Sequence, residues 1–365
     1  MRRQEGYEGK EELKMGRVKE RSLLFFKITA LAAILAVTCT CSAVSADNLR
    51  VDPSAERNYI SIQAAVDAAK AEDTIFVSPG TYVENLKINK QVRIWSDSRS
   101  HEDTVIRAAD PAQNTVEISG NRVSFSGFGI EGSEKAEISL TGAKNCFINN
   151  NRVQGTEYGI FLNDSESNTI SDNIIVLNEK GIRLESSDSN IIQDNIIAYN
   201  YGSGISLEGS KRNIIYNNYL KNAENVEEKT VNADNIWQSP LVTRKNIVHG
   251  PYIGGNFWAD LEGKGYSETG VDGNSNGICD SSYNVTGGGI DKFPLFPKVP
   301  NAVKVLESKL NATAYEQGLA NKTRVEPPVN ATNGTTEPSK KETPGPGLGI
   351  AVLAMGSAYF LRRDR

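Results

Sequence analysis

The middle of the chain repeats itself with a period of 22 or 23 residues. The aligned copies begin at Asn145, Asn168, Asn190 and Asn213, and the pattern extends by one further step on each side, to Asn121 and Asn235. A regular period of this length predicts a solenoid, in which each coil buries its apolar face only against its neighbours. Leucine-rich repeats share this period, so the pattern inside each copy has to distinguish the two.

A Gly-Ile-x-Leu-like core returns in each copy. Because successive side chains of a strand point to opposite faces, the Ile and Leu should point inward and the residue between them outward. The expected inward residues are Ile160, Leu162, Ile182, Leu184, Ile205 and Leu207, and the expected outward residues are Phe161, Arg183 and Ser206. No helix-length amphipathic segment separates the strands, and the LxxLxLxxN consensus of leucine-rich repeats is absent.

A second short strand in each copy leads to a turn that contains asparagine. The strands are expected at Thr169–Ser171, Ile191–Gln193 and Ile214–Tyr216, and the turns at Asn150, Asn173, Asn195 and Asn218. Asparagine tolerates the left-handed conformation and bonds to neighbouring backbone, so stacked copies should form a ladder. We therefore predict an all-β chain that folds as a right-handed parallel β-helix of 22–23 residues per coil.

The overall charge argues against a nucleic-acid partner. The 365 residues carry a net charge of −5 and a pI of about 5.4, and the basic residues are scattered rather than clustered. The length leaves room for one solenoid with flanking segments.

Residues 1–46 have the pattern of an export signal. Arg21 and Lys27 precede the apolar run Ile28–Val37, and Val44 and Ala46 stand at −3 and −1 of a predicted cut before Asp47. Met15 is an alternative start, and an uncleaved anchor helix is the alternative interpretation. After removal of this segment the mature chain keeps Cys146 and Cys279, which an oxidising compartment would allow to pair if they lie close together.

A short amphipathic helix is expected just before the first strands. Ile62, Ala65, Val66 and Ala69 fall on one helical face and would cover the open end of the solenoid. The run IQAAVDAA, followed by DTI and GTY, resembles the first coil of NosD-like and pectate-lyase-like β-helix proteins. Residues Gly254–Phe296 similarly resemble the closing segment of NosD-like repeat proteins of archaeal surfaces. The resemblance implies one β-helix domain over residues 47–299.

The last 66 residues change in composition. Residues 300–343 are rich in Asn, Thr, Pro, Lys and Glu and predict a glycosylated stalk. The predicted glycosylation sites are Asn311, Asn321, Asn330 and Asn333, with Asn163 and Asn284 further upstream.

The C-terminal segment, residues 344–365, ends in a short apolar run followed by basic residues. Leu348–Leu361 would span about 21 Å as a helix, less than the ~30 Å of a hydrocarbon core. The segment resembles the PGF-type signal that archaeosortases exchange for a lipid, with Pro-Gly-Pro-Gly-Leu in place of Pro-Gly-Phe. It predicts attachment to the membrane or envelope through sorting and lipid-attachment machinery, and it leaves open whether the tail is cleaved or retained.

Residues 272–280 match the first part of an EF-hand-type loop. Oxygen ligands are expected from Asp272, Asn274, Asn276, Asp280 and the carbonyl group of Ile278. Position 12 is Tyr283 rather than Glu, so Asp260 or Asp291 would have to supply a further ligand. The loop predicts a structural Ca²⁺ site, and a metal-free turn is the alternative.

NosD-like proteins are associated with copper, but the residues of this chain do not predict a copper site. All three methionines lie in the terminal segments, and His101, His249, Cys146 and Cys279 are spread over four regions of the sequence.

The outward positions of the repeats hold the ligand-binding candidates. Tyr158, Phe161, Arg183 and Tyr201 lie on or beside one predicted face, where aromatic rings could stack on sugars. Hydrolases on this fold use grouped aspartates as acid and base, and no pair of carboxylates recurs at matching positions of adjacent repeats. We therefore predict a non-catalytic surface protein whose partners are surface glycans or envelope proteins. The alternative is a polysaccharide lyase or epimerase acting on acidic glycans, with Arg183 as its base.

Overall fold

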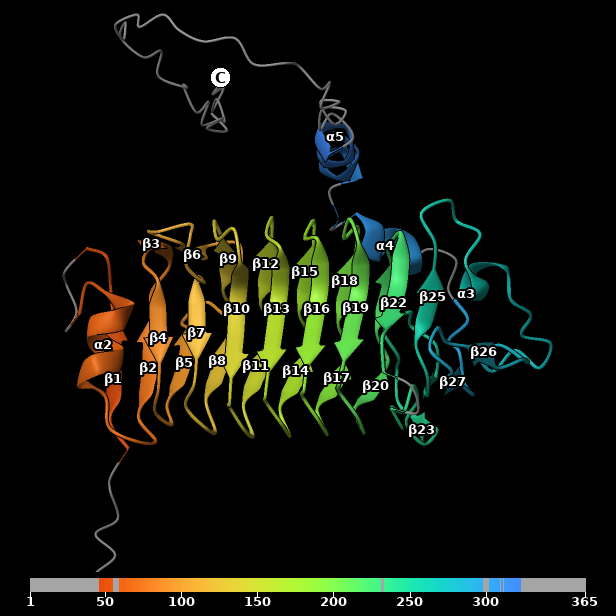
Figure 1. The fold of residues 1–365 in the computed structure, drawn as a ribbon, viewed down its shortest axis with the longest axis horizontal. Helices are drawn as coiled ribbons and strands as arrows, with labels where there is room; N and C mark the ends of the chain where they lie inside the picture. Colours follow the sequence, from red (N-terminus) through yellow and green to blue (C-terminus); the bar gives the residue numbers. More distant parts are fainter. Residues whose placement is uncertain are drawn as a thin grey trace, which may run out of the picture. The chain divides into compact units, whose positions relative to one another are not determined.

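The computed structural model describes residues 46–54, 59–230, 233–297, 302–308, 310 and 312–322. Its body is a stack of coils, each built from three short strands that belong to three parallel sheets (Figure 1). The right-handed parallel β-helix predicted from the period is thus confirmed.

The first sheet contains the strand that follows the Gly-Ile-x-Leu core. It comprises β1 (Asn48–Val51), β2 (Thr74–Val77), β5 (Arg93–Ser96), β8 (Ser124–Ser126), β11 (Phe147–Asn149), β14 (Thr169–Ser171), β17 (Ile191–Gln193) and β20 (Ile214–Tyr216).

The second sheet contains the Gly-Ile-x-Leu strands themselves. It comprises β4 (Leu86–Ile88), β7 (Val116–Ile118), β10 (Ala136–Thr141), β13 (Tyr158–Asn163), β16 (Lys180–Glu185), β19 (Ser203–Glu208) and β22 (Glu224–Glu228).

The third sheet closes each coil. It comprises β3 (Gly80–Val83), β6 (Thr104–Arg107), β9 (Gly129–Glu131), β12 (Arg152–Gln154), β15 (Ile174–Val176), β18 (Ile196–Ala198), β21 (Tyr219–Lys221) and β25 (Phe257–Ala259). Two short antiparallel pairs follow near the C-terminal end of the stack, β23 (Val242–Thr243) with β24 (Tyr252–Ile253) and β26 (Tyr283–Asn284) with β27 (Ile290–Asp291).

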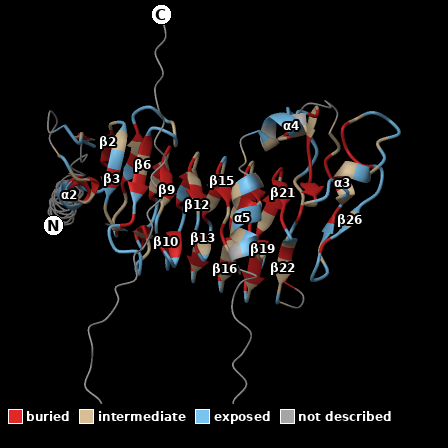
Figure 2. Cartoon of the chain, turned by 90° about the horizontal axis from the view of Figure 1, so that it is seen from above, coloured by how far each residue is buried: buried red, intermediate tan, exposed pale blue. Residues whose placement is uncertain are grey.

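The interior is a continuous apolar column. Red stretches on the strands in Figure 2 mark the buried residues. The six residues expected to point inward from the Gly-Ile-x-Leu cores are all fully buried. They stack in register, since Ile160 pairs with Ile182 and Ile182 with Ile205. Each coil therefore buries its aliphatic residues against the coil above and the coil below.

Asparagine ladders run through all three corners of the coils. One corner stacks Asn151, Asn173, Asn195, Asn218 and Asn256, the second stacks Asn168, Asn190, Asn213 and Asn235, and the third stacks Asn178, Asn200, Asn222 and Asn225. Within each ladder, the side-chain oxygen of one asparagine accepts hydrogen bonds from the backbone and side-chain amides of the asparagine before it in the ladder. The first members, Asn151, Asn168 and Asn178, accept the backbone amides of Phe128, Cys146 and Thr156. These side chains replace water as partners of buried backbone groups.

The structure shifts by one residue both a predicted ladder position, Asn150, and the start of the first aligned copy, Asn145. Asn150, expected in the ladder, is left-handed with φ of 56°, and Asn151 makes the ladder bonds. Likewise Asn145 is left-handed, and Cys146 occupies the buried position that Asn168 holds one coil later. The bend itself falls on the residue before the ladder position, which the sequence pattern did not separate from its neighbour.

The helix α2 (Ile62–Ala68) caps the N-terminal end, as predicted. Its own residues Ile62, Ala65 and Val66 are buried against the first coils. The carboxylate of Glu84 accepts hydrogen bonds from the backbone amides of Ile62 and Gln63, each at 2.9 Å, which fixes the helix to the first coils.

The C-terminal end is closed by residues 233–297, which include the short helix α3 (Tyr266–Thr269). Trp237 and Trp258 are buried there, with ring centroids 5.9 Å apart. The fully buried Asp291 accepts hydrogen bonds from the backbone amides of Asn256 and Phe293 and from the indole of Trp258.

Two further helices contact the flank of the β-helix within the segment predicted to be stalk. They are α4 (Ala302–Glu307) and α5 (Ala312–Lys322). Glu307 accepts hydrogen bonds from Lys221 and from the Tyr219 hydroxyl, and Tyr315 packs on Tyr199 and Tyr201. The part of the predicted stalk that the structure describes is therefore helical, and it lies against the third-sheet side of the solenoid.

None of the helices in the described ranges is long and apolar enough to cross a membrane. The predicted export signal lies outside the described residues except for its last position, and the C-terminal sorting segment lies wholly outside them.

Candidate functional site

The outward face of the second sheet gathers charged and aromatic side chains in register. One column of neighbouring positions holds Glu117, Ser139, Phe161, Arg183, Ser206 and Glu227. A second column, two residues further along each strand, places Asn163 beside Glu185 and Glu185 beside Glu208. Contrary to the expectation from the sequence, a pair of carboxylates does occupy matching positions of adjacent coils.

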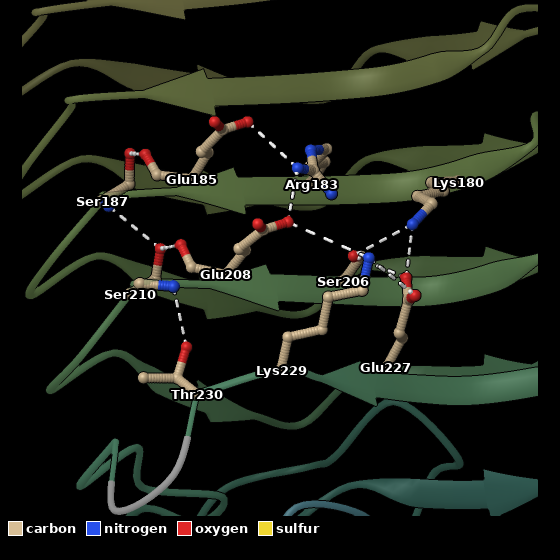
Figure 3. Close-up of polar contacts among 11 residues, drawn as sticks. Lys180, Arg183, Glu185, Ser187, Ser206, Glu208, Ser210, Glu227, Lys229 and Thr230 are labelled. Atoms are coloured by element: carbon tan, nitrogen blue, oxygen red, sulfur yellow. Dashed lines mark hydrogen bonds and ion pairs between the residues drawn. The ribbon is translucent and has the colours of Figure 1, made fainter.

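Arg183 lies between these two carboxylates (Figure 3). Its Nη2 atom is 3.0 Å from Glu185 and 2.8 Å from Glu208, and its side chain is only 11% exposed. Like charges in register repel each other across neighbouring strands. The guanidinium therefore allows Glu185 and Glu208 to stand side by side.

A second group of ion pairs adjoins the first. Lys180 pairs with Glu227, the Ser206 hydroxyl donates to Glu227 at 2.8 Å, and Lys229 lies 3.2 Å from the same carboxylate. Lys229 also lies 3.9 Å from Glu208, which joins the two groups. We call Lys180, Arg183, Glu185, Glu208, Glu227 and Lys229 the ion-pair network, with three cations and three carboxylates.

The contacts of the network favour the ionised forms of Glu227, Glu208 and Arg183. Burial opposes ionisation of Glu227, but hydrogen bonds from Lys180, Ser206 and Lys229 outweigh it and lower the pKa to about 2. The hydrogen bond from Arg183 lowers the pKa of Glu208. Burial favours neutral Arg183, yet bonds to Glu208 and Glu185 raise its pKa. A general base or acid works best with a pKa near the operating pH, and these three groups are held away from that range.

Three of the four predicted ligand-face residues meet at one end of this network. The rings of Tyr158 and Phe161 are 5.2 Å apart, and the Arg183 guanidinium lies 5.8 Å from the centroid of Tyr158. Tyr201 does not join them, because it lies at another corner under α5. Its ring stacks on Tyr315 at 5.3 Å and 8°. The predicted face is therefore split, and its fourth member is covered by a segment distant in sequence.

The loop over residues 272–280 is closed by its own side chains. Asp272 accepts from the backbone amides of Asn276 and Gly277, and Asp280 accepts from that of Gly273. Asn274 and Asn276 also accept backbone amides within the loop. The two suggested extra ligands are used elsewhere, since Asp291 is bonded inside the C-terminal core and Asp260 accepts the amides of Glu262 and Lys264.

The two cysteines of the described chain are both free and buried. The thiol of Cys146 donates to the carbonyl group of Gly120 inside the β-helix, and that of Cys279 lies near the Leu295 carbonyl group. The suggested disulfide is absent between these two described residues.

The predicted glycosylation sites fall in different environments. Asn284 is exposed on β26, whereas Asn163 is half-buried on β13, and the hydroxyl of its sequon residue Ser165 is buried in a serine ladder. Asn321 lies in α5. Asn311, Asn330 and Asn333 lie outside the described residues.

The sequence analysis missed most of the ion-pair network. The motif Leu-Glu ends two successive cores, at Leu184-Glu185 and Leu207-Glu208, so the carboxylate pair was visible as a repeat. The pairing of Lys180 with Glu227 had no such signal, because these residues are 47 positions apart.

Comparisons with known proteins agree with this architecture. The family described as periplasmic copper-binding protein (NosD) matches residues 66–263, more than half of the chain. A cell surface glycoprotein of Methanothermus fervidus is 33% identical over 132 residues. That match covers 36% of this chain and 21% of the relative, so the chain spans about a fifth of the relative's length.

Among solved structures, an alginate lyase from Paenibacillus sp. is similar with a TM-score of 0.41 and 17% identity, covering 50% of this chain and 68% of the lyase. The pectate lyase Pel9A is similar with a TM-score of 0.44 and 16% identity, covering 50% and 56%. We draw nothing about activity from these two likenesses.

The described residues do not fit a copper site. Copper prefers imidazole and sulfur ligands, but Cys146 and Cys279 are buried in separate parts of the fold. No group of three or more His, Cys, Asp or Glu side chains that could hold a metal ion occurs in the described ranges. The membership in the family therefore rests on the repeat and the fold rather than on a metal centre. With its ladder-forming coils and a family match over residues 66–263, this chain belongs to the NosD family.

Proposed function

We propose that this chain is an exported, non-catalytic β-helix protein of the cell surface, whose partners are surface glycans or envelope proteins. The observation that carries the non-catalytic part is the ion-pair network. Its cations and carboxylates neutralise one another, so Glu208 and Glu227 are held below the pKa that a general base needs, and the network offers no unpaired cluster for an acidic polymer.

The surface location is supported by two relationships. The Methanothermus relative is a cell surface glycoprotein, and the family is described as periplasmic. Attachment by the C-terminal segment and glycosylation are parts of the same proposal. Labelling of intact cells with a membrane-impermeant reagent should modify the protein, and protection until lysis would contradict the surface location.

Incubation with polysaccharides tests the absence of catalysis. The purified full chain should leave acidic and neutral polymers unchanged in mass spectra, with and without calcium. New oligosaccharides or an unsaturated uronate would overturn the proposal and favour the lyase or epimerase alternative. Loss of those products in Arg183→Met, with a Lys144→Met protein as the matched control, would then place the chemistry on the second sheet.

The loop at residues 272–280 is proposed to bind Ca²⁺ as a structural staple. The support is its run of oxygen-bearing side chains around a tight turn, with Gly277 at φ of 82°. Because a ligand that binds only the folded state stabilises it, millimolar Ca²⁺ should raise the Tm and EDTA should reverse the rise. The rise should vanish in Asp272→Ala and persist in Asp188→Ala. An equal rise in both variants would refute binding at this loop.

A further inference from the structure

A hollow on the outward face of the first sheet has the features of a sugar-binding site. It has a volume of about 430 Å³ and is lined by Trp95, Arg99, Ser124, Ser126, Asn149 and Asn150. This volume lies within the ~300–1,000 Å³ of small-molecule sites. The hollow is on a different sheet from the ion-pair network and from the aromatic residues selected from the sequence.

The hollow arises from the side chains that stand next to one another across the strands. Trp95 on β5 is in register with Ser126 on β8, which is in register with Asn149 on β11. In the adjacent column Ser124 is in register with Phe147, whose side chain is 55% exposed. The two small serines of β8 therefore stand between the larger side chains of β5, Arg93 and Trp95, and those of β11, Phe147 and Asn149.

The indole ring is held in place by its neighbours. Its Nε1 donates to the Ser124 hydroxyl at 3.0 Å, and its ring meets Phe76 edge-on, with centroids 6.1 Å apart. A fixed aromatic ring beside hydroxyl and amide groups suits a pyranose, which has one apolar face and a polar rim.

The rim carries one positive charge. Arg99 is exposed, and its guanidinium has no carboxylate partner among the described residues, unlike Arg183 and Arg50. The loop that carries it is anchored, since Asn150 donates from Nδ2 to the Arg99 carbonyl group at 2.8 Å and Arg99 itself is left-handed with φ of 54°. No carboxylate lines the hollow.

We propose that this hollow binds a carboxylate-bearing pyranose unit of a surface glycan. The sugar ring stacks on Trp95, its hydroxyl groups bond to the serine and asparagine side chains, and its carboxylate pairs with Arg99. This inference rests on the proposed glycan-binding role and gives that role a site and a sugar class.

Titration with defined oligosaccharides tests the site. Trp237 and Trp258 are buried, so the emission of the full chain should report on Trp95 when tetragalacturonate is added. We expect saturable binding that weakens about tenfold or more in Arg99→Gln, because a lost charge-assisted hydrogen bond is worth roughly 1.5–3 kcal/mol. Isothermal titration should show no binding to Trp95→Ala. Arg93→Gln, an exposed change beside the hollow, should bind like the parent.

Each contrary outcome has a defined meaning. Failure of tetragalacturonate to bind the folded parent, or undiminished binding to Trp95→Ala, overturns the site. Equal affinity for cellotetraose, with no effect of Arg99→Gln, overturns the acidic sugar class. Cleavage of the bound tetragalacturonate would refute the non-catalytic role while leaving the site intact, so the two proposals fail separately.

Discussion

Glu137 illustrates how a single residue can interrupt a repeat. It occupies the position on β10 that Gly159, Gly181 and Gly204 hold in later coils. A Cβ atom at Gly159 would lie 2.8 Å from the amide of Asn178, so glycine leaves room for the third ladder. In the earlier coil no asparagine stands there, and the Glu137 carboxylate accepts hydrogen bonds from the Ser133 amide and the Thr115 hydroxyl instead.

Stability should therefore depend on pH through Glu137. Burial raises its pKa from 4.5 to about 7, despite the hydrogen bonds from Thr115 and Ser133. Because the folded pKa is the higher one, its contribution to the free energy of unfolding is complete below pH 4.5 and is lost as the pH rises to 7. The loss is at most about 3 kcal/mol. Urea unfolding of Glu137→Gln should be less sensitive to pH over this range than the parent.

Glu134→Gln is the control for that measurement, since Glu134 is exposed on the same coil. Asp291, whose pKa burial raises to about 6, contributes a dependence of the same sign and remains in both proteins. An identical pH profile for the parent and Glu137→Gln would contradict the assignment.

Arg183 should stabilise the second sheet by forming ion pairs with two adjacent carboxylates. Its replacement by Met leaves Glu185 and Glu208 adjacent and should lower the free energy of unfolding by about 1–2 kcal/mol. The effect should shrink in high salt, which screens the exposed carboxylates.

The double variant Arg183→Met with Glu208→Gln should recover part of this loss, because one of the two repelling charges is gone. A double-mutant cycle with chemical denaturation measures the coupling. Strict additivity of the two substitutions would show that the carboxylate pair has no energetic consequence.

At the scale of elements, the ladders decide how the coils stack. At many of the corners, the residue before the ladder asparagine has the left-handed conformation. Examples are Asp172 before Asn173 and Asp194 before Asn195. The bend turns the next side chain inward, where it can bond only to the coils above and below. A corner of this kind is thus specified by two consecutive residues, and the buried asparagine side chain bonds to the equivalent asparagine of the neighbouring coil.

Removal of one ladder member should be costly. Asn195→Ala deprives the backbone and side-chain amides of Asn173 of their acceptor at 3.0 Å and breaks the bond to Asn218. Buried donors without partners cost about 1–3 kcal/mol each, so we expect a loss of about 3 kcal/mol in denaturant titrations. Thr169→Ala, on the outward face of β14, should cost less than about 0.5 kcal/mol. Equal small losses would show that water replaces the ladder.

At the scale of the whole molecule, the chain returns to cover its own flank. The helices α4 and α5 reach the third-sheet side through Glu307 and Tyr315, which is 6% exposed. The two contacts join residues about 86 and 114 positions apart. Nothing in the composition of this polar segment distinguishes its docked part from a stalk.

Loosening these contacts should expose the segment to proteolysis without weakening the β-helix. The combined change Glu307→Gln and Tyr315→Ala should increase the rate of cleavage after residue 297 in limited proteolysis, while the main thermal transition stays within about 2 °C of the parent because few core contacts are lost. Glu316→Gln, an exposed change on α5, serves as the matched control. A large drop in the main transition would show that the helices are part of the core.

The sequence by itself determined the coil length, the inward-facing residues and the N-terminal capping helix. These features follow from periods of two and of 22–23 residues, and such patterns depend only on local backbone geometry and on burial against the next coil. The pairing of Glu185 with Glu208 belongs to the same class, although it became evident only in the structure.

The tertiary structure alone decided the rest. The one-residue shift from Asn150 to Asn151 depends on which residue takes the left-handed conformation, and the separation of Tyr201 from Tyr158 depends on a helix from the far end of the chain. The hollow beside Trp95 exists because small side chains on β8 stand next to large ones on β5 and β11. These features depend on lateral neighbours one or more coils away, and the identity of such neighbours is fixed only when the register of the whole stack is fixed.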